Sequence, residues 1–166
     1  MSEPLDAVVS EVARETFEQL AFVLPPQDDT APLPEADARV CVTFRGPFSG
    51  SLLISLSSSL LPLLAANMLG MEESETSPGD RDDAFREVAN VVCGNLLPRI
   101  AGPKPVFGIS SPRCLPPSDG PRDALPGVTL ATVALLLENG RAIVQLNVDD
   151  PAALEHARAA AVGVPA

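Results

Sequence analysis

Two alternating runs separated by Asn139-Gly140 constrain the fold of this chain most. Residues 128–137 and 142–148 alternate in large part between apolar and polar positions, which is the period of a strand with one buried face. Asn-Gly between such runs is the strongest short signal for a β-hairpin. Residues 40–45 and 51–56 predict a second hairpin, with its turn at residues 46–50. An antiparallel sheet is therefore expected.

The remaining segments predict helices and one further strand. Helices are expected at residues 5–22, 59–69, 81–97 and 151–161, and a strand at 106–115. Gly70 and Pro98 should limit the second and third helices. This order indicates an α+β fold, with helices packed on a mostly antiparallel sheet. The length suits a single domain, 1–166, with a Pro-rich acidic loop at 24–38 and a C-terminal helix and tail at 151–166.

One uncharged run needs a decision between two structures. Residues 51–69 carry no charge, and nineteen residues are long enough for a membrane span. Leu52, Ile54 and Leu56 alternate with polar neighbours, however, and three serines at 57–59 offer a helix cap before Pro62. We therefore favour a strand followed by a short buried helix.

Charge and cysteine content exclude several classes of function. The chain has 11 Lys and Arg residues against 22 Asp and Glu residues, a net charge of −11, so we expect no nucleic-acid partner and no anionic membrane. Three cysteines without a close pair and one histidine, His156, predict neither a disulfide framework nor a metal site. The acidic N-terminus lacks a signal-peptide pattern, and we expect a reducing, cytoplasmic location. Cys93 is expected to pack rather than to act as a nucleophile.

The predicted helix at 81–97 has two opposite faces. At 100° per residue, its apolar positions form one stripe: Phe85, Val88, Ala89, Val92 and Leu96. The opposite stripe holds Asp83, Glu87, Asn90 and Gly94. Glu87 and Asn90 are three residues apart and can act on one partner, and a glycine beside them would let that partner approach closely. On spacing alone, a merely solvated face remains the alternative.

The same helix resembles the signature of the CheC/CheX/FliY family of chemotaxis phosphatases. That signature is Asp or Ser, three residues, Glu, two residues, Asn, and a proline a little over twenty residues later. Asp83, Glu87 and Asn90 match it, and Pro112 is the proline, one residue closer than usual. The resemblance extends over about residues 5–148 and includes the segment 45–50.

A weak internal repeat accompanies this resemblance. Residues 11–14 (Glu-Val-Ala-Arg) and 87–90 (Glu-Val-Ala-Asn) lie 76 positions apart, and each helix precedes a hairpin. The repeat predicts a pseudo-two-fold axis, with Arg14 where the second copy has Asn90. A single intact Glu-x-x-Asn motif resembles CheX more than CheC, which carries two.

The resemblance implies a function and a role for each residue. Family members dephosphorylate the aspartyl phosphate of CheY-like response regulators. Asn90 would hold the attacking water and Glu87 would pair with a lysine of the regulator, while Asp83, Gly94 and Pro112 would border the contact. The Mg²⁺ would belong to the regulator, so the chain would need no cofactor of its own, and a homodimer is expected. Two alternatives remain open: a non-catalytic CheX-like binding or dimerisation module that recognises a receiver domain, and an unrelated α+β domain.

Overall fold

The computed structural model describes residues 3–21, 32–116 and 126–163. Its elements, in chain order, are α1 (Leu5–Gln19), β1 (Ala38–Arg45), β2 (Gly50–Leu56), η1 (Ser58–Leu60), α2 (Leu61–Leu69), η2 (Glu73–Glu75), α3 (Pro78–Ala101), β3 (Gly108–Ile109), β4 (Arg113–Leu115), β5 (Val128–Leu137), β6 (Gly140–Val148) and α4 (Pro151–Val162). The predicted α+β class is confirmed. Residues 24–31 of the predicted acidic loop lie outside the described residues.

All strand pairs among the described residues are antiparallel. The sheet has the order β3-β1-β2-β6-β5, and β4 also pairs with β1. Both predicted hairpins are present, β1 with β2 and β5 with β6. They join in the middle of the sheet through β2 and β6, whose pairing runs from Gly50 opposite Val148 to Leu56 opposite Ala142. The pseudo-two-fold repeat itself stays a prediction.

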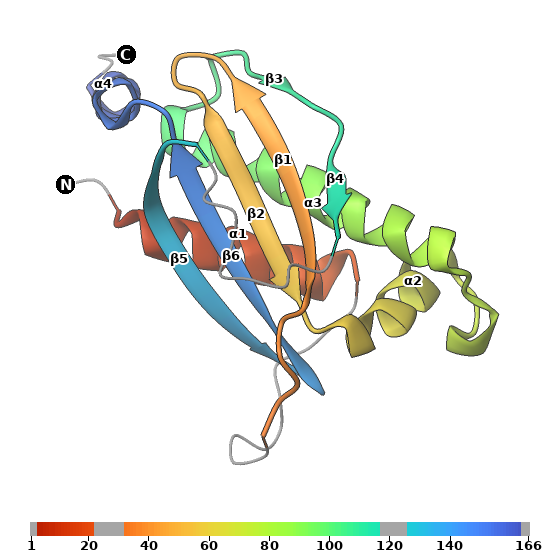
Figure 1. Cartoon of the computed structure of the whole chain (residues 1–166). Helices are drawn as coiled ribbons and strands as arrows, with labels where there is room; N and C mark the ends of the chain where they lie inside the picture. The colour runs from red at the N-terminus through yellow and green to blue at the C-terminus, as the bar shows by residue number, and fades with distance from the viewer. Residues whose placement is uncertain (1–2, 22–31, 117–125, 164–166) are drawn as a thin grey trace.

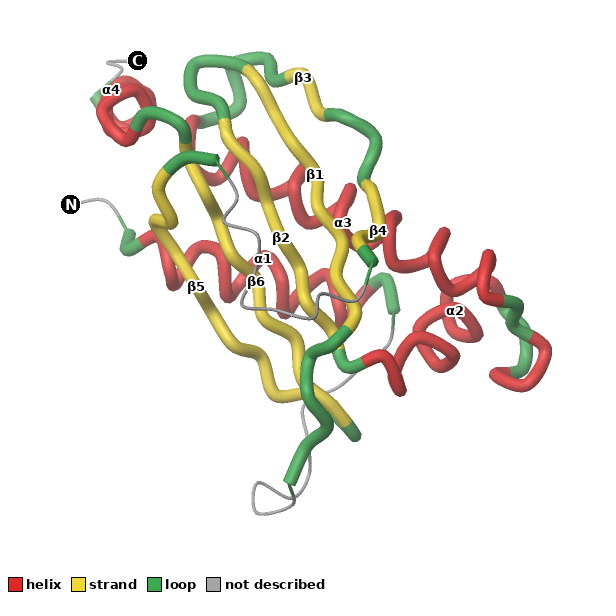
Figure 2. Tube along the Cα trace, viewed as in Figure 1, coloured by secondary structure: helices red, strands yellow, loops and turns green. Residues whose placement is uncertain are grey.

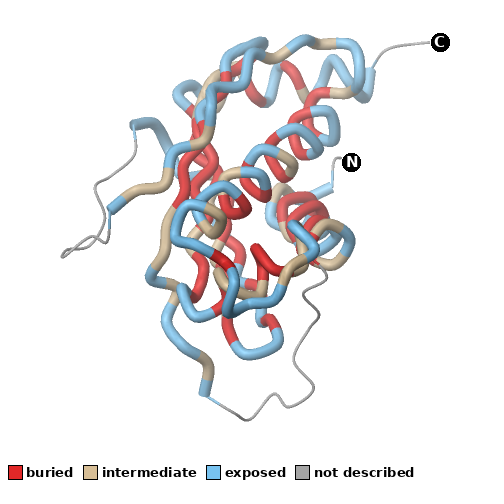
Figure 3. Tube along the Cα trace, turned by 90° about the vertical axis from the view of Figure 1, so that its right-hand side faces the viewer, coloured by how far each residue is buried: buried red, intermediate tan, exposed pale blue. Residues whose placement is uncertain are grey.

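Helices α1 and α3 lie side by side on one face of the sheet (Figures 1 and 2). Their apolar faces and the facing side chains of the strands form the core, in which Val9, Val88, Leu52 and Val144 are fully buried. Figure 3 shows buried segments of the helices and the strands facing one another. At about 25 cal/mol per Å² of buried apolar surface, this layer supplies the main driving force for folding. In the part of the chain that the structure describes, no helix covers the opposite face of the sheet.

Helix α3 is longer at both ends than the predicted 81–97. At its start, the Ser77 hydroxyl accepts a hydrogen bond from the Asp80 N–H at 3.0 Å, and the Asp80 carboxylate accepts one from the Ser77 N–H at 3.0 Å. This capping box fixes the first turn. At its end, Pro98 lies inside the helix, although a proline has no N–H for the carbonyl four residues earlier. The helix continues to Ala101 because its last turns are buried, with Leu97 1% and Ile100 4% exposed.

The second hairpin turns one residue earlier than predicted. Leu137 pairs with Gly140, so the turn is Glu138-Asn139, with Asn139 at φ 66°. Gly140 is a strand residue, and its small size serves packing. A Cβ there would lie 2.5 Å from Leu60 Cδ1.

Two other local predictions were wrong. The strand predicted at 106–115 is interrupted and forms β3 and β4, because both short pieces pair with β1 and the residues between them do not. The predicted serine cap before α2 is absent. Instead, the Ser57 hydroxyl donates to the Pro34 carbonyl at 2.8 Å, and a 3₁₀ turn leads into the helix.

The uncharged run at 51–69 forms β2, η1 and α2, as favoured over a membrane span. Among the described residues, no helix has the length and apolar character needed to cross a membrane. The predicted C-terminal helix is present as α4, and it begins with an acidic cap. Asp150 Oδ1 accepts a hydrogen bond from the Ala152 N–H at 3.0 Å.

Candidate functional site

The exposed stripe predicted on α3 is confirmed. Asp83, Glu87, Asn90 and Gly94 are all exposed. The opposite side of the helix is buried against the sheet and α1, since its core positions are at most 4% exposed, as listed here: Ala84, Phe85, Val88, Ala89, Val92, Cys93, Leu96, Leu97 and Ile100. One face of the helix therefore stabilises the fold, and the other is free to contact solvent or a partner.

The polar stripe forms one wall of an open cleft of about 590 Å³. Its lining residues come from α3 (Asp83, Arg86, Glu87 and Asn90) and from the end of β3 and the segment before β4 (Ile109, Ser110, Ser111 and Pro112). The fold thus brings Pro112 to the same cleft as Glu87 and Asn90, despite the shorter spacing in the sequence. Gly94 lies on the same exposed face, about one turn beyond Asn90, and does not line the cleft.

The second wall of the cleft is held by strand β1 of the sheet. β3 and β4 both pair with β1, and Ser110 is tied to Thr43 between them. The Thr43 hydroxyl and the Thr43 N–H donate to Ser110 Oγ at 2.8 and 3.0 Å, and the Ser110 N–H donates to the Thr43 carbonyl at 2.9 Å. Three hydrogen bonds at one residue fix the rim from which Ser111 and Pro112 face α3.

The charges in the cleft are unequally paired. Arg86 forms an ion pair with Asp83 three residues earlier, and this hydrogen bond raises the pKa of the Arg86 guanidinium. Among the described residues, the side chains of Glu87 and Asn90 have no hydrogen-bond or ion-pair partner within the chain. The negative charge of Asp83 is balanced internally, whereas the carboxylate of Glu87 and the amide of Asn90 are available to an external partner.

Four of the residues that line the cleft were not predicted from the sequence to belong to the site. Arg86 had a usable signal, because its spacing of three from Asp83 is that of an ion pair on a helix. Ile109, Ser110 and Ser111 had none, since their place opposite the helix depends on pairing with β1 across more than sixty residues of chain.

No alternative nucleophile accompanies the cleft on its helix. Cys93 is 1% exposed, and burial raises the pKa of its thiol to about 12. The thiol therefore stays protonated at neutral pH, as a packing residue would. No three His, Cys, Asp or Glu side chains of the described ranges are placed to hold a metal ion together.

Residues 11–14, which the weak repeat pairs with residues 87–90, make a contact within the chain. Glu11 of α1 accepts a hydrogen bond from Arg99 of α3 at 2.8 Å. This ion pair joins the two helices that cover the sheet. The carboxylate that would correspond to Glu87 is thus engaged within the chain.

Comparisons with known proteins give one matching family model and several structures of the same fold. The family model described as chemotaxis phosphatase CheX matches residues 39–122. No curated protein sequence matches the chain significantly. Among solved structures, a chemotaxis protein CheX from Vibrio vulnificus is 18% identical, with 88% of this chain and 97% of that chain covered and a TM-score of 0.67.

Two further structures have the same fold. A chemotaxis protein CheX from Desulfovibrio desulfuricans is 16% identical, with coverage of 87% and 98% and a TM-score of 0.66. The CheX of a CheX-CheY-BeF3-Mg²⁺ complex from Borrelia burgdorferi is 15% identical, with coverage of 87% and 97% and a TM-score of 0.65. These likenesses extend the match from the middle of the sequence to the fold of nearly the whole chain.

Proposed function

The chain belongs to the family of the chemotaxis phosphatase CheX, and from this premise we propose that it hydrolyses the aspartyl phosphate of a CheY-like response regulator. One observation carries the proposal: an acid and an amide, Glu87 and Asn90, are exposed in the same open cleft, and neither side chain pairs with another described residue. The Borrelia burgdorferi relative, whose structure was determined with CheY, BeF3 and Mg²⁺, supports the choice of partner.

The shape of the cleft suits a macromolecular substrate. It is polar and open, whereas sites for free small molecules enclose most of their ligand in a largely apolar pocket. A phosphorylated aspartate on the surface of a receiver domain can be reached by a helix face. Gly94 and Pro112 would border that contact, because one leaves bare backbone on the exposed face and the other lines the facing wall.

The chemistry needs positioning more than it needs a strong nucleophile. An acyl phosphate is already activated, so hydrolysis depends on a water held in line with phosphorus and on control of charge. We assign the water to Asn90, since an amide offers both a donor and an acceptor and adds no negative charge. We assign the docking contact to Glu87, which would pair with a lysine of the regulator. Asp83 would border the contact, with its charge offset by Arg86.

The metal in this proposal belongs to the partner. The Mg²⁺ of a phosphorylated receiver domain would balance charge on the phosphoryl group. Asp83 is already paired with Arg86, so the cleft does not offer a set of free carboxylates of the kind that holds Mg²⁺. The chain itself would contribute side chains and no cofactor.

We further propose that the protein acts in the cytoplasm as a homodimer. The edge strand β5 pairs only with β6 among the described strands, and its ten residues carry no charge. Val128 and Leu136 on this strand are 49% and 51% exposed. An uncharged, unprotected edge favours pairing with a second strand. Light scattering should therefore give the mass of two chains, and Leu136→Lys should shift it toward one.

The decisive experiment follows the decay of phosphorylated receiver domains. Wild-type protein should accelerate the decay for at least one member of a small panel, and Asn90→Ala should reduce that acceleration by about 10²-fold or more. Asn95→Ala is the matched control, since Asn95 is exposed on the same helix but outside the cleft. Circular dichroism should show that all three proteins are folded.

Two outcomes would change the assignment. Equal loss in Asn90→Ala and Asn95→Ala would contradict the role of Asn90. Binding of the phosphorylated receiver domain by the wild type, with no change in phosphate lifetime, would favour the non-catalytic binding module instead.

A further inference from the structure

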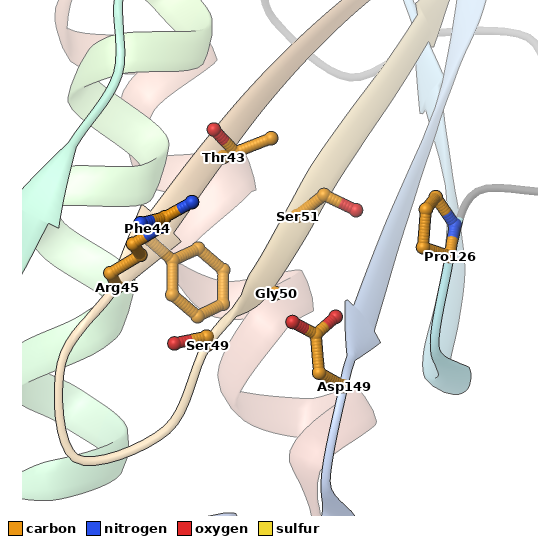
Figure 4. A pocket seen from close by; sticks show the side chains of 8 residues that line it. All are labelled: Thr43, Phe44, Arg45, Ser49, Gly50, Ser51, Pro126 and Asp149. Atoms are coloured by element: carbon orange, nitrogen blue, oxygen red, sulfur yellow. The ribbon is translucent and has the colours of Figure 1, made fainter.

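A second cavity lies on the other face of the sheet, away from α1 and α3. It has a volume of about 220 Å³ and sits where the β1–β2 turn meets the end of β6 (Figure 4). It is lined by Thr43, Phe44, Arg45, Ser49, Gly50, Ser51, Pro126 and Asp149. None of these residues lines the cleft beside α3, although Thr43 holds Ser110 at its rim.

The register of the sheet arranges the polar side chains in two rows. Thr43, Ser51 and Asn147 are cross-strand neighbours, so their side chains share one face. One step further along the same face, Ser49 lies between Arg45 on the β1 side and Asp149 on the β6 side. Neighbouring strands are about 4.8 Å apart, so the backbones of Arg45 and Asp149, two strand spacings apart, are separated by roughly 10 Å. The cavity therefore has a cation at one side, an anion at the other and hydroxyl groups between them.

The hydroxyl of Ser51 is the unusual group in this arrangement. Ser51 is only 5% exposed, and its Oγ is the one buried side-chain oxygen or nitrogen of the described residues without a hydrogen-bond partner. Its neighbours are satisfied: Thr43 donates to Ser110 at 2.8 Å and Thr129 donates to Asn147 at 2.8 Å. A buried hydroxyl without a partner is destabilising, so a polar group that reached it from the cavity would stabilise it.

The charged side chains at the rim are also available. Arg45 and Asp149 are exposed, and neither forms an ion pair with another described residue. In Figure 4, they stand on opposite sides of β2, with the Ser51 oxygen directed toward β6. A purely anionic ligand would meet the Asp149 carboxylate, and a purely cationic one would meet the Arg45 guanidinium. A ligand with both charges satisfies both.

We propose that this cavity binds a small zwitterion of the α-amino-acid class. The ligand's carboxylate pairs with Arg45, its ammonium group pairs with Asp149, and Ser51 supplies a hydrogen bond between them. The volume of about 220 Å³ leaves room for an amino acid with a short side chain. This binding function is independent of the phosphatase proposal, since Arg45, Ser51 and Asp149 do not line the cleft beside α3.

The test is calorimetric titration of the full chain with L-serine. Two analogues remove one charge each: N-acetyl-L-serine has no ammonium group, and L-serinamide has no carboxylate. We expect wild-type protein to bind L-serine with a dissociation constant in the millimolar range or below, and to bind each analogue at least about tenfold more weakly. Arg45→Gln and Asp149→Asn should each weaken the binding of L-serine by a similar factor. Arg39→Gln, on the same strand but outside the cavity, should not.

The variant Ser51→Ala tests whether the Ser51 hydroxyl binds the ligand or is only a buried group without a partner. Without ligand, the variant should unfold at a higher temperature than wild type, because the orphan hydroxyl is gone. Its affinity for L-serine should nevertheless fall several-fold. No heat of binding from wild-type protein at 20 mM L-serine, on the order of what millimolar affinity requires, would overturn the proposal. Binding that is unaffected by Arg45→Gln and Asp149→Asn would overturn it as well.

Discussion

Replacement of Gly94 by alanine should make the protein more stable and its proposed contact with a regulator weaker. Gly94 lies inside α3, is exposed, and has no positive φ. A Cβ built on it meets nothing within 4 Å, so the substitution adds no clash. Glycine in a helix interior costs about 1 kcal/mol relative to alanine. For a chain of this size, that difference raises the unfolding midpoint by about 2–4 °C.

The two effects of Gly94→Ala need two assays. Thermal unfolding followed by circular dichroism measures the gain in stability, and the decay of a phosphorylated receiver domain measures function. Asn95→Ala is the control, because it also improves helix propensity at an exposed position but lies off the polar stripe. Its phosphatase activity should match wild type, whereas Gly94→Ala should lose activity. A lower unfolding midpoint for Gly94→Ala would refute the description of this helix position as open. Unchanged activity would refute the role of Gly94 at the contact.

Three further outcomes are expected. Gly140→Ala should lower the free energy of unfolding in urea by about 1–3 kcal/mol, because its Cβ would lie 2.5 Å from Leu60 Cδ1; an unchanged midpoint would contradict this packing. Thr43→Val removes the hydroxyl that donates to Ser110 at 2.8 Å, so the Michaelis constant for the phosphorylated regulator should rise several-fold while the fold survives; equal kinetics would mean that this rim is held without the bond. Hydrogen bonds at the capping box lower the pKa of Asp80, so its stabilising effect is present above pH 4 and is lost as pH falls through the lowered value; the difference in stability between wild type and Asp80→Asn should therefore shrink between pH 7 and pH 3, and a constant difference would argue against it.

The parts of the fold predicted from the sequence are those set by local periodicity. Alternation along the two hairpins determines which face of each strand is buried, and the 3.6-residue period of α3 places Glu87 and Asn90 opposite the core. These patterns need only the chain neighbours of each residue. The stripe could therefore be recognised before anything was known of its surroundings.

The errors arose where distant residues decide the local structure. Pro98 is tolerated inside α3 because the turns around it are buried by tertiary packing. The strand expected at 106–115 is interrupted because β1 accepts two short partners instead of one long one. Gly140 is small because Leu60 packs against it. In each case the competing force was packing or pairing across the fold, which no window of sequence contains.

The second wall of the cleft is held by β1, and this determines what an insertion or deletion between α3 and β3 can change. The position of Pro112 is set by the pairing of β3 and β4 with β1 and by the Thr43–Ser110 bonds. Phe107 is anchored by its packing on Phe44 and Phe48, so the connection at 102–106 only has to span the gap. A residue gained or lost in that connection would change its path over the surface and leave both walls where they are. The distance along the chain from Asn90 to Pro112 is then a property of the connector, free to drift, while the distance across the cleft is not.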